Sequence, residues 1–173
     1  LGTEPYTGKT LADLEAELNQ SFEQILIDVI GPEGASGAYF VMDDALQSRL
    51  LLDPFVGVSS DGSPTGFHPR GHGTFAKIIE EYVVNRKSLD LTEAIRKMTS
   101  FAADVLGIAD RGRIVPGMAA DLVIFDPAKV KATATYPQPH QLAAGFELVV
   151  ANGEVAFVNG AAAADMFGRV LRP

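Results

Sequence analysis

Residues 37–62, GAYFVMDDALQSRLLLDPFVGVSSDG, decide the fold class that we predict for this chain. The two short apolar runs at 37–42 and 55–59 have the length and the flanking turn residues of buried strands. Between them, Asp43 begins a helical segment that ends near Pro54. We therefore predict a strand, a helix and a second strand in succession.

Two predicted helices precede these strands. Thr10 is a suitable N-cap with Asp13 three residues later, and Ser21 opens a second helix that Gly31 ends. The resulting order over residues 10–60 is helix, helix, strand, helix, strand. Such alternation is typical of α/β proteins and predicts a parallel sheet.

Further helical segments follow a loop rich in glycine, proline and histidine. An amphipathic helix is predicted to begin at Thr74, and Asp90 with Glu93 forms a capping box for the next helix. Thr99 interrupts that helix before a last one that ends at Gly107. The sequence thus predicts helices up to about residue 107.

The pattern changes to short strand-like runs from residue 108 onward. Asn152 and Gly153 join the last two runs and form the dipeptide most typical of a tight β-hairpin. We therefore divide the chain into an α/β part, 1–107, and a small, mostly β domain, 108–173. The strand-like runs are residues 114–115, 121–125, 146–151 and 155–158.

The composition narrows the class of protein. The 173 residues include 14 basic and 22 acidic side chains, a formal net charge of −8, so neither a nucleic acid nor an anionic membrane is an expected partner. The chain has no cysteine, which excludes disulfides and thiolate metal sites. It has no apolar run of transmembrane length, and we expect a cytoplasmic protein. Because it begins with Leu1 rather than methionine, we also expect a piece of a longer protein.

Asp61 is the first candidate for a catalytic or metal-binding residue. It follows the predicted strand 55–59 in the turn SSDGS, and the C-terminal ends of parallel strands are where reacting groups collect. A carboxylate there can bind a metal ion or act as a general base. The alternative is an ordinary aspartate that stabilises the turn before Gly62.

Two histidines and an arginine share the following loop. His68 and His72 are four residues apart, a spacing that suits a metal on a helix, but the proline and glycines around them predict a non-helical loop. The third histidine, His140, is distant in sequence, so we do not expect a self-contained zinc site. Arg70 can clamp a substrate carboxylate with two parallel hydrogen bonds, or it can form an ordinary salt bridge with a nearby acid.

Several stretches resemble one enzyme family. The segment DRGRIVPGMAADLVIFD at residues 110–126 resembles the stretch at which amidohydrolase-superfamily chains leave a metal-dependent barrel and enter a small β domain. Five other stretches, in this order, are similar to the C-terminal part of N-acyl-D-amino-acid deacylases, the D-aminoacylases. They are residues 6–14, 55–62, 68–75, 146–153 and 168–172.

This resemblance implies a fold that the chain contains only in part. Residues 1–107 match the C-terminal portion of a metal-dependent (β/α)8 barrel, in which 37–42 is about the seventh strand and 55–59 the eighth. Residues 108–173 match part of a small β-sandwich domain. The family's other metal ligands belong to earlier strands, so the resemblance implies that they precede Leu1.

The same resemblance implies a function. The family hydrolyses the amide bond of a small-molecule N-acyl-D-amino acid to a carboxylate and a D-amino acid, with zinc as the cofactor. Asp61 matches the aspartate at the metal centre that moves a proton from the attacking water to the leaving amine. Arg70 matches the arginine that holds the substrate's α-carboxylate. We expect the chain alone to be inactive and to bind no zinc, because it carries only Asp61 of the metal site.

Two other functions stay open at this point. A cyclic-amide hydrolase of the dihydroorotase or hydantoinase type shares the motif at residues 110–126, although the loop at 68–70 argues against it. A non-catalytic fragment or binding module built on the same part of the fold is the other alternative. Because barrel strands without neighbours leave open sheet edges, self-association through those edges is a further hypothesis.

Overall fold

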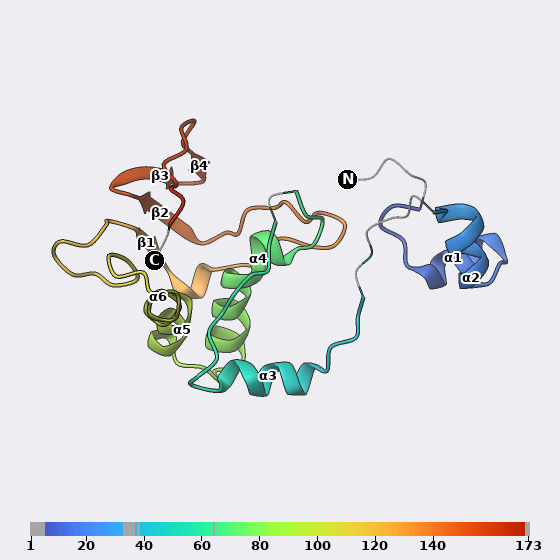
Figure 1. Cartoon of the computed structure of the whole chain (residues 1–173), viewed down its shortest axis with the longest axis horizontal. Coiled ribbons are helices and arrows are strands. Elements are labelled where there is room, and N and C mark those ends of the chain that lie inside the picture. The colour runs from blue at the N-terminus through green and yellow to red at the C-terminus, as the bar shows by residue number, and fades with distance from the viewer. Residues whose placement is uncertain (1–5, 33–36, 38, 64, 172–173) are drawn as a thin grey trace. The chain divides into compact units, whose positions relative to one another are not determined.

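A computed structural model describes residues 6–32, 37, 39–63 and 65–171 of the chain (Figure 1). The chain divides into two compact units, Leu1–Val41 and Met42–Pro173, each with its own internal contacts. The candidate residues Asp61 and Arg70 both belong to the second unit.

The first unit is helical. It contains three segments, α1 (Leu11–Leu18), α2 (Phe22–Gln24) and η1 (Ile25–Ile30), the last being a π-helical continuation of α2. The predicted cap of α1 is confirmed. Thr10 Oγ1 accepts the Asp13 N–H at 3.1 Å, and the Asp13 carboxylate accepts the Thr10 N–H at 2.9 Å. Leu14 and Ile25 are buried and form the core of this unit.

The strands predicted at 37–42 and 55–59 are not found among the residues that the structure describes. Residues 39–42 and 55–59 make no strand pairing, and Ala38 lies outside the described residues. An apolar run becomes a strand only when a neighbouring segment completes its backbone hydrogen bonds. Both runs instead expose large apolar side chains: Tyr39 is 83% exposed and Phe55 is 86% exposed. The helix between the runs is confirmed as α3 (Asp44–Leu52).

A buried lysine forms hydrogen bonds with backbone groups of residues 53–58, a segment that overlaps the strand predicted at 55–59. Lys97 lies on α5 (Leu91–Met98), and its fully buried Nζ donates hydrogen bonds to the carbonyl oxygens of Asp53 and of Val56, the latter at 2.7 Å. The Lys97 carbonyl accepts the Val58 N–H at 3.3 Å. The segment that leads to Asp61 is therefore fixed by a helix rather than by a sheet.

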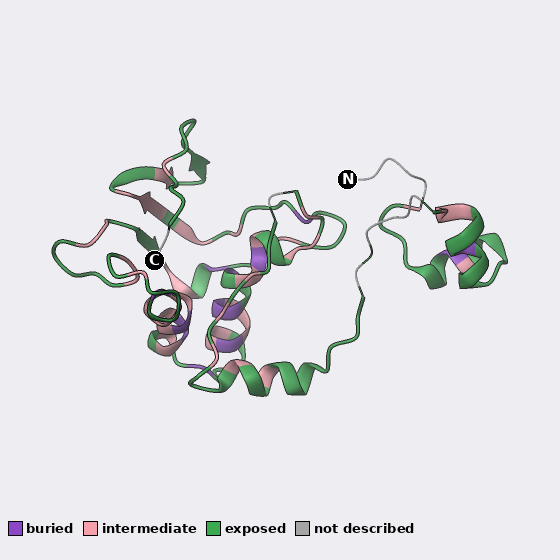
Figure 2. Cartoon of the chain, viewed as in Figure 1, coloured by how far each residue is buried: buried purple, intermediate pink, exposed green. Residues whose placement is uncertain are grey.

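The core of the second unit lies along one continuous helix, α4 (Arg70–Lys77) and its π-helical continuation η2 (Ile78–Asn85). One cluster of buried residues, including Ile78, Tyr82 and Ala94, joins η2 to α5. A second cluster joins α4 and η2 to Val130 (Figure 2). Both clusters therefore pack against the helix whose first residue is Arg70.

Helix α4 begins at Arg70, before the predicted start at Thr74. The non-helical loop that we predicted is wrong for residues 70–73. Pro69 occupies the N-cap position, where a proline's missing N–H is not needed by the helix. The glycines that follow are tolerated because the core clusters hold the same helix further along.

The predicted boundaries of the last two helices are confirmed. Asp90 caps α5 by accepting a backbone N–H of its first turn at 2.8 Å, whereas Glu93 forms an ion pair within α5 instead of completing the capping box. Thr99 separates α5 from α6 (Ser100–Leu106), and Gly107 ends α6 in a left-handed conformation.

The sheet has four antiparallel strands in the order β1-β2-β3-β4. They are β1 (Leu122–Phe125), β2 (Phe146–Ala151), β3 (Glu154–Val158) and β4 (Ala161–Ala162), and a short 3-10 helix, η3 (Pro127–Lys129), follows β1. The predicted hairpin is confirmed, since Asn152 and Gly153 join β2 to β3 with φ angles of 53° and 88°. No strand forms at 114–115, and among the described residues there is no parallel strand pair, so the predicted parallel sheet is not found there.

The division near residue 108 and self-association through sheet edges stay predictions. All four strands follow residue 108, and the edge strand β1 exposes about half of Val123 and of Ile124. Across the described ranges, no helix has both the length and the apolar character that crossing a membrane requires.

Candidate functional site

Asp61 and Arg70 form an ion pair at the N-terminal end of α4. The Asp61 Oδ2 and Arg70 Nη2 atoms lie 2.9 Å apart, and the two side chains are 83% and 47% exposed, respectively. Asp61 follows the extended segment that Lys97 fixes, and Arg70 is the first residue of α4. The structure thus brings together the two residues that the sequence singled out.

The absence of a side chain at Gly62 allows this close approach. A Cβ atom added to Gly62 would lie 2.7 Å from the Gly71 Cα, which is closer than a side chain permits. The turn after Asp61 therefore lies directly against the first turn of α4. Asp61 itself has a φ angle of 47°, in the left-handed region that aspartate tolerates better than most residues. An exposed side chain on such a constrained turn favours a functional role over a packing role.

The turn is not closed by the Asp61 carboxylate. The Gly62 N–H donates to the Ser60 hydroxyl at 3.1 Å, so Ser60 takes the role that the alternative interpretation gave to Asp61. The carboxylate pairs with Arg70 instead. Its contact with solvent leaves it able to exchange a proton.

Arg70 forms the salt bridge that we considered as an alternative, and it keeps further hydrogen-bonding capacity. The contact with Asp61 uses Nη2, and none of the described residues binds the other guanidinium nitrogens. A cation at a helix N-terminus is opposed by the helix dipole, so stability of α4 alone does not explain this residue. Arg70 can therefore bind a second anion beside Asp61.

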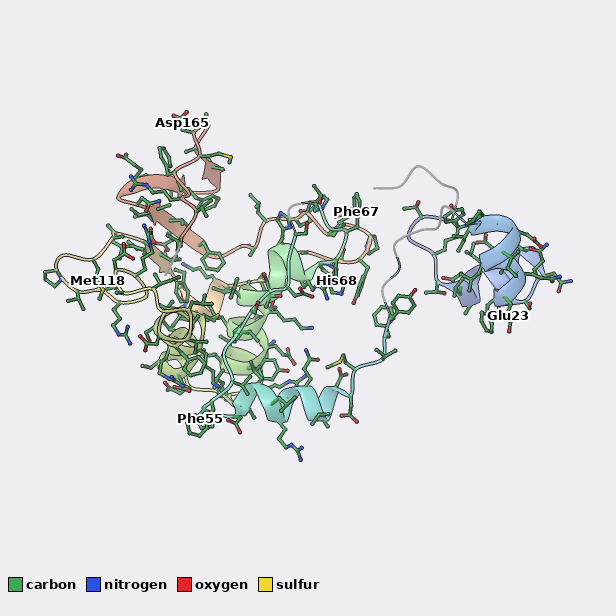
Figure 3. The ribbon with its side chains drawn as sticks, viewed as in Figure 1. Glu23, Phe55, Phe67, His68, Met118 and Asp165 are labelled. Carbon is green, nitrogen blue, oxygen red and sulfur yellow. The ribbon has the colours of Figure 1, made fainter. Side chains whose placement is uncertain are left out.

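His68 connects α4 to a distant segment of the chain, and its side chain lies beside the N-terminal end of that helix (Figure 3). Its Nδ1 accepts the Arg70 backbone N–H at 3.0 Å, and its Nε2 is 3.3 Å from the Tyr136 hydroxyl. The two rings meet edge to face with centroids 5.1 Å apart. Burial lowers the pKa of His68, as do the charges of Arg70 and Lys77, against an opposing effect of Asp61. The imidazole is therefore neutral at neutral pH.

Tyr136 reaches His68 because the segment that carries it packs along α4 and η2. Glu80 accepts the Ala132 N–H at 2.8 Å and binds Lys131 Nζ at 3.0 Å. The hydrogen bond from Ala132 holds the pKa of Glu80 below its usual value, burial opposes it, and Lys131 adds to the lowering. Sequence reasoning missed Tyr136, since it lies 68 positions from His68 and no local pattern points to it.

His72 and His140 lie together next to Phe67. The imidazole centroids are 5.4 Å apart, and His140 Nε2 is 2.9 Å from the Gly66 carbonyl oxygen. His72 Nδ1 is buried without a hydrogen-bond partner among the described residues. In that part of the chain, no group of three or more His, Asp or Glu side chains is arranged to hold a metal ion. The described residues by themselves therefore do not form a complete zinc site. Asp61 could contribute one ligand to such a site.

Comparisons with known proteins find similarity over nearly the whole chain. A model of the amidohydrolase family matches residues 6–157. An N-acyl-D-aspartate deacylase of Alcaligenes xylosoxydans xylosoxydans is 38% identical over 169 residues, which cover 96% of this chain and 33% of that protein. The chain spans about a third of the length of the curated relatives it matches.

Two solved structures resemble the chain closely. A crystal structure of D-aminoacylase matches 98% of this chain and 36% of its own, with a TM-score of 0.84 and 34% identity. The second is an N-acyl-D-glutamate deacylase from Bordetella bronchiseptica, complexed with zinc and a phosphonate inhibitor that mimics the tetrahedral intermediate. It matches 96% of this chain and 35% of its own, with a TM-score of 0.80 and 33% identity.

Proposed function

The chain belongs to the amidohydrolase family, and from this premise we propose that it is part of a longer, metal-dependent deacylase that hydrolyses the amide bond of N-acyl-D-amino acids. The observation that carries the proposal is the pairing of Asp61 with Arg70. The deacylase and the D-aminoacylase to which the chain is similar match it over almost its whole length. The reaction needs a group that moves a proton and a group that binds a carboxylate. Asp61 and Arg70 have those two chemistries.

Asp61 is the proton-transfer group in this proposal. Its exposed carboxylate can accept a proton from the attacking water and pass it to the nitrogen as the amide bond breaks. The ion pair with Arg70 orients the carboxylate before substrate arrives. The aspartate therefore needs no large rearrangement to act.

Arg70 is the substrate-binding group. Its planar guanidinium matches a carboxylate in shape and can form two parallel hydrogen bonds with it. Nη2 carries two N–H groups, and while one faces Asp61 the other can join Nε or Nη1 in binding a substrate α-carboxylate, which would then lie close to Asp61. One side chain thus connects substrate recognition to the proton-transfer group.

Zinc is the proposed cofactor, since the similar N-acyl-D-glutamate deacylase was solved with zinc. Asp61 would be one ligand, and the others would come from residues outside 1–173, because the described residues form no complete site. We therefore expect the 173-residue chain alone to be inactive. Turnover by the purified chain in added zinc would contradict this.

The proposed fold of the longer protein is a (β/α)8 barrel followed by a small β domain. Residues 37–42 and 55–59 would there gain strand partners, and exposed side chains such as Tyr39 and Phe55 would be covered. A cytoplasmic location stays a prediction from the sequence.

A substrate panel with the full-length, zinc-loaded protein tests the proposed function. We expect hydrolysis of N-acetyl-D-amino acids and no hydrolysis of dihydroorotate or hydantoins. Activity on the cyclic amides alone would favour the cyclic-amide hydrolase, and inactivity on every substrate would favour the binding module. Arg70→Ala should raise KM about tenfold or more while changing kcat less, because it removes a contact that the bound substrate already makes. An unchanged KM would refute the carboxylate-binding role of Arg70.

A further inference from the structure

We propose that His68 is a positioning residue, which acts with Tyr136 to fix the first turn of α4 and thereby aims the Arg70 guanidinium at the substrate's α-carboxylate. The inference rests on the proposed function. It adds two residues to the site that need not touch the substrate themselves.

The first step is the contact between His68 and the start of α4. The first N–H groups of a helix have no acceptor within the helix and need one outside it. Pro69, at the N-cap position, provides no side-chain hydrogen bond. His68 provides two acceptors instead: Nδ1 binds the Arg70 N–H at 3.0 Å, and the carbonyl oxygen binds the Gly71 N–H at 3.2 Å.

The second step is the support that Tyr136 gives to the imidazole. Because Nδ1 of the neutral ring accepts a hydrogen bond, the ring proton is on Nε2, which donates to the Tyr136 hydroxyl at 3.3 Å. The edge-to-face contact of the two rings restricts rotation of His68 further. Tyr136 is itself anchored, since its segment is bound to Glu80 on η2.

The third step is the path from this turn to the ion pair. Arg70 moves with the first turn of α4 because it is part of that turn. The segment that leads to Asp61 is held separately by Lys97, so losing the His68 contact should displace Arg70 more than Asp61. His68 belongs to neither core cluster, so losing its contact should disturb the site more than the fold.

The experiment compares four variants of the full-length, zinc-loaded protein. His68→Ala removes the side-chain acceptor, whereas His68→Asn keeps an oxygen that can accept the Arg70 N–H, as capping asparagines do. Tyr136→Phe keeps the ring and removes the hydroxyl. Gln141→Ala is the matched control, since its exposed side chain lies near Tyr136 in sequence and bonds to Gln138. The two substrates are an N-acetyl-D-amino acid and the corresponding N-acetyl amine, which lacks the α-carboxylate.

We expect His68→Ala to raise KM for the N-acetyl-D-amino acid about tenfold and to leave kcat within about threefold. Its kcat/KM for the N-acetyl amine should stay at the wild-type value, because that substrate has no carboxylate for Arg70 to bind. His68→Asn should bring KM back to within about threefold of wild type. The KM of Tyr136→Phe should lie between those of His68→Ala and wild type, and the KM of Gln141→Ala should match that of wild type.

Equal losses of kcat/KM on both substrates would show a general structural role of His68 and would overturn the inference. An unchanged KM in His68→Ala and Tyr136→Phe would overturn it as well. If His68→Ala does not fold, His68→Asn and Tyr136→Phe decide by the same comparison of substrates. A wild-type protein that hydrolyses no N-acyl-D-amino acid refutes the proposed function too, whereas an active wild type with unaltered variants refutes this inference alone.

Discussion

Replacing Lys97 with methionine tests what holds the segment beneath Asp61. Lys97 has no exposed surface, and its Nζ donates to the carbonyl oxygens of Asp53 and Val56. Methionine has nearly the same length and shape but no donor. Lys97→Met therefore removes two hydrogen bonds while filling most of the same space.

The expected effect is a net loss of about 2 kcal/mol in the free energy of unfolding. A hydrogen bond to a charged group contributes about 1.5–3 kcal/mol, and this variant removes two of them; the Asp53 oxygen keeps the Val56 N–H, whereas the Val56 oxygen loses the Lys97 donor. Relief from burying an ammonium group offsets part of that loss. Burial is also the main reason that the pKa of Lys97 is lowered. Because the two lost hydrogen bonds outweigh the relief, we expect destabilisation.

Urea unfolding followed by circular dichroism measures this difference. Lys77→Met is the matched control, since Lys77 is an exposed lysine on α4 and the same substitution there should change stability by less than about 0.5 kcal/mol. Equal stability of Lys97→Met and wild type would refute the reasoning. Greater stability of the variant would show that the cost of burying the charge exceeds the value of its hydrogen bonds.

Two further predictions concern the surroundings of the site. Glu80→Gln should destabilise the protein by about 1 kcal/mol at pH 7, because the ionised carboxylate binds Ala132 and Lys131. The pKa of folded Glu80 is lowered from 4.5, so the stabilising effect of its carboxylate is present above that value and is lost as the pH falls through the folded pKa. The urea midpoints of wild type and variant should therefore converge in acid. Midpoints that diverge there would contradict this reasoning. Gly62→Ala should push the Asp61 turn away from Gly71 and lower kcat/KM of the full-length protein about tenfold or more, because small misplacements at a reacting centre are costly. Gly168→Ala, where a Cβ meets nothing within 4 Å and the backbone is not left-handed, is its control for activity, and equal activity of Gly62→Ala and wild type would argue against the close contact.

Local signals in the sequence predicted much of the fold. Thr10 and Asp90 cap the helices that they were expected to cap, and Asn152 with Gly153 forms the expected hairpin. Each of these depends on hydrogen bonds or backbone angles within a few residues. Such features can be derived from a short window of sequence.

Features that depend on distant partners were not predictable in this way. The run at 55–59 has the pattern of a strand, but its backbone is satisfied in part by Lys97, and no window of sequence shows that a strand partner is absent. Pro69 was interpreted as a break in the helix, whereas the core clusters further along α4 support a start at Arg70. Asp61 and Arg70 were chosen from the sequence, but the contact of His68 with Tyr136 was not, since the latter comes from a remote segment.

Release of D-amino acid from an N-acetyl-D-amino acid is the most direct test of the central claim that Asp61 serves a deacylase. The rate is measured for the full-length wild-type and Asp61→Asn proteins in zinc, with the metal content of each determined. We predict sustained turnover by the wild type and a loss of about a thousandfold in kcat for Asp61→Asn, because asparagine cannot carry the proton. Turnover by Asp61→Asn at the wild-type rate would contradict the claim.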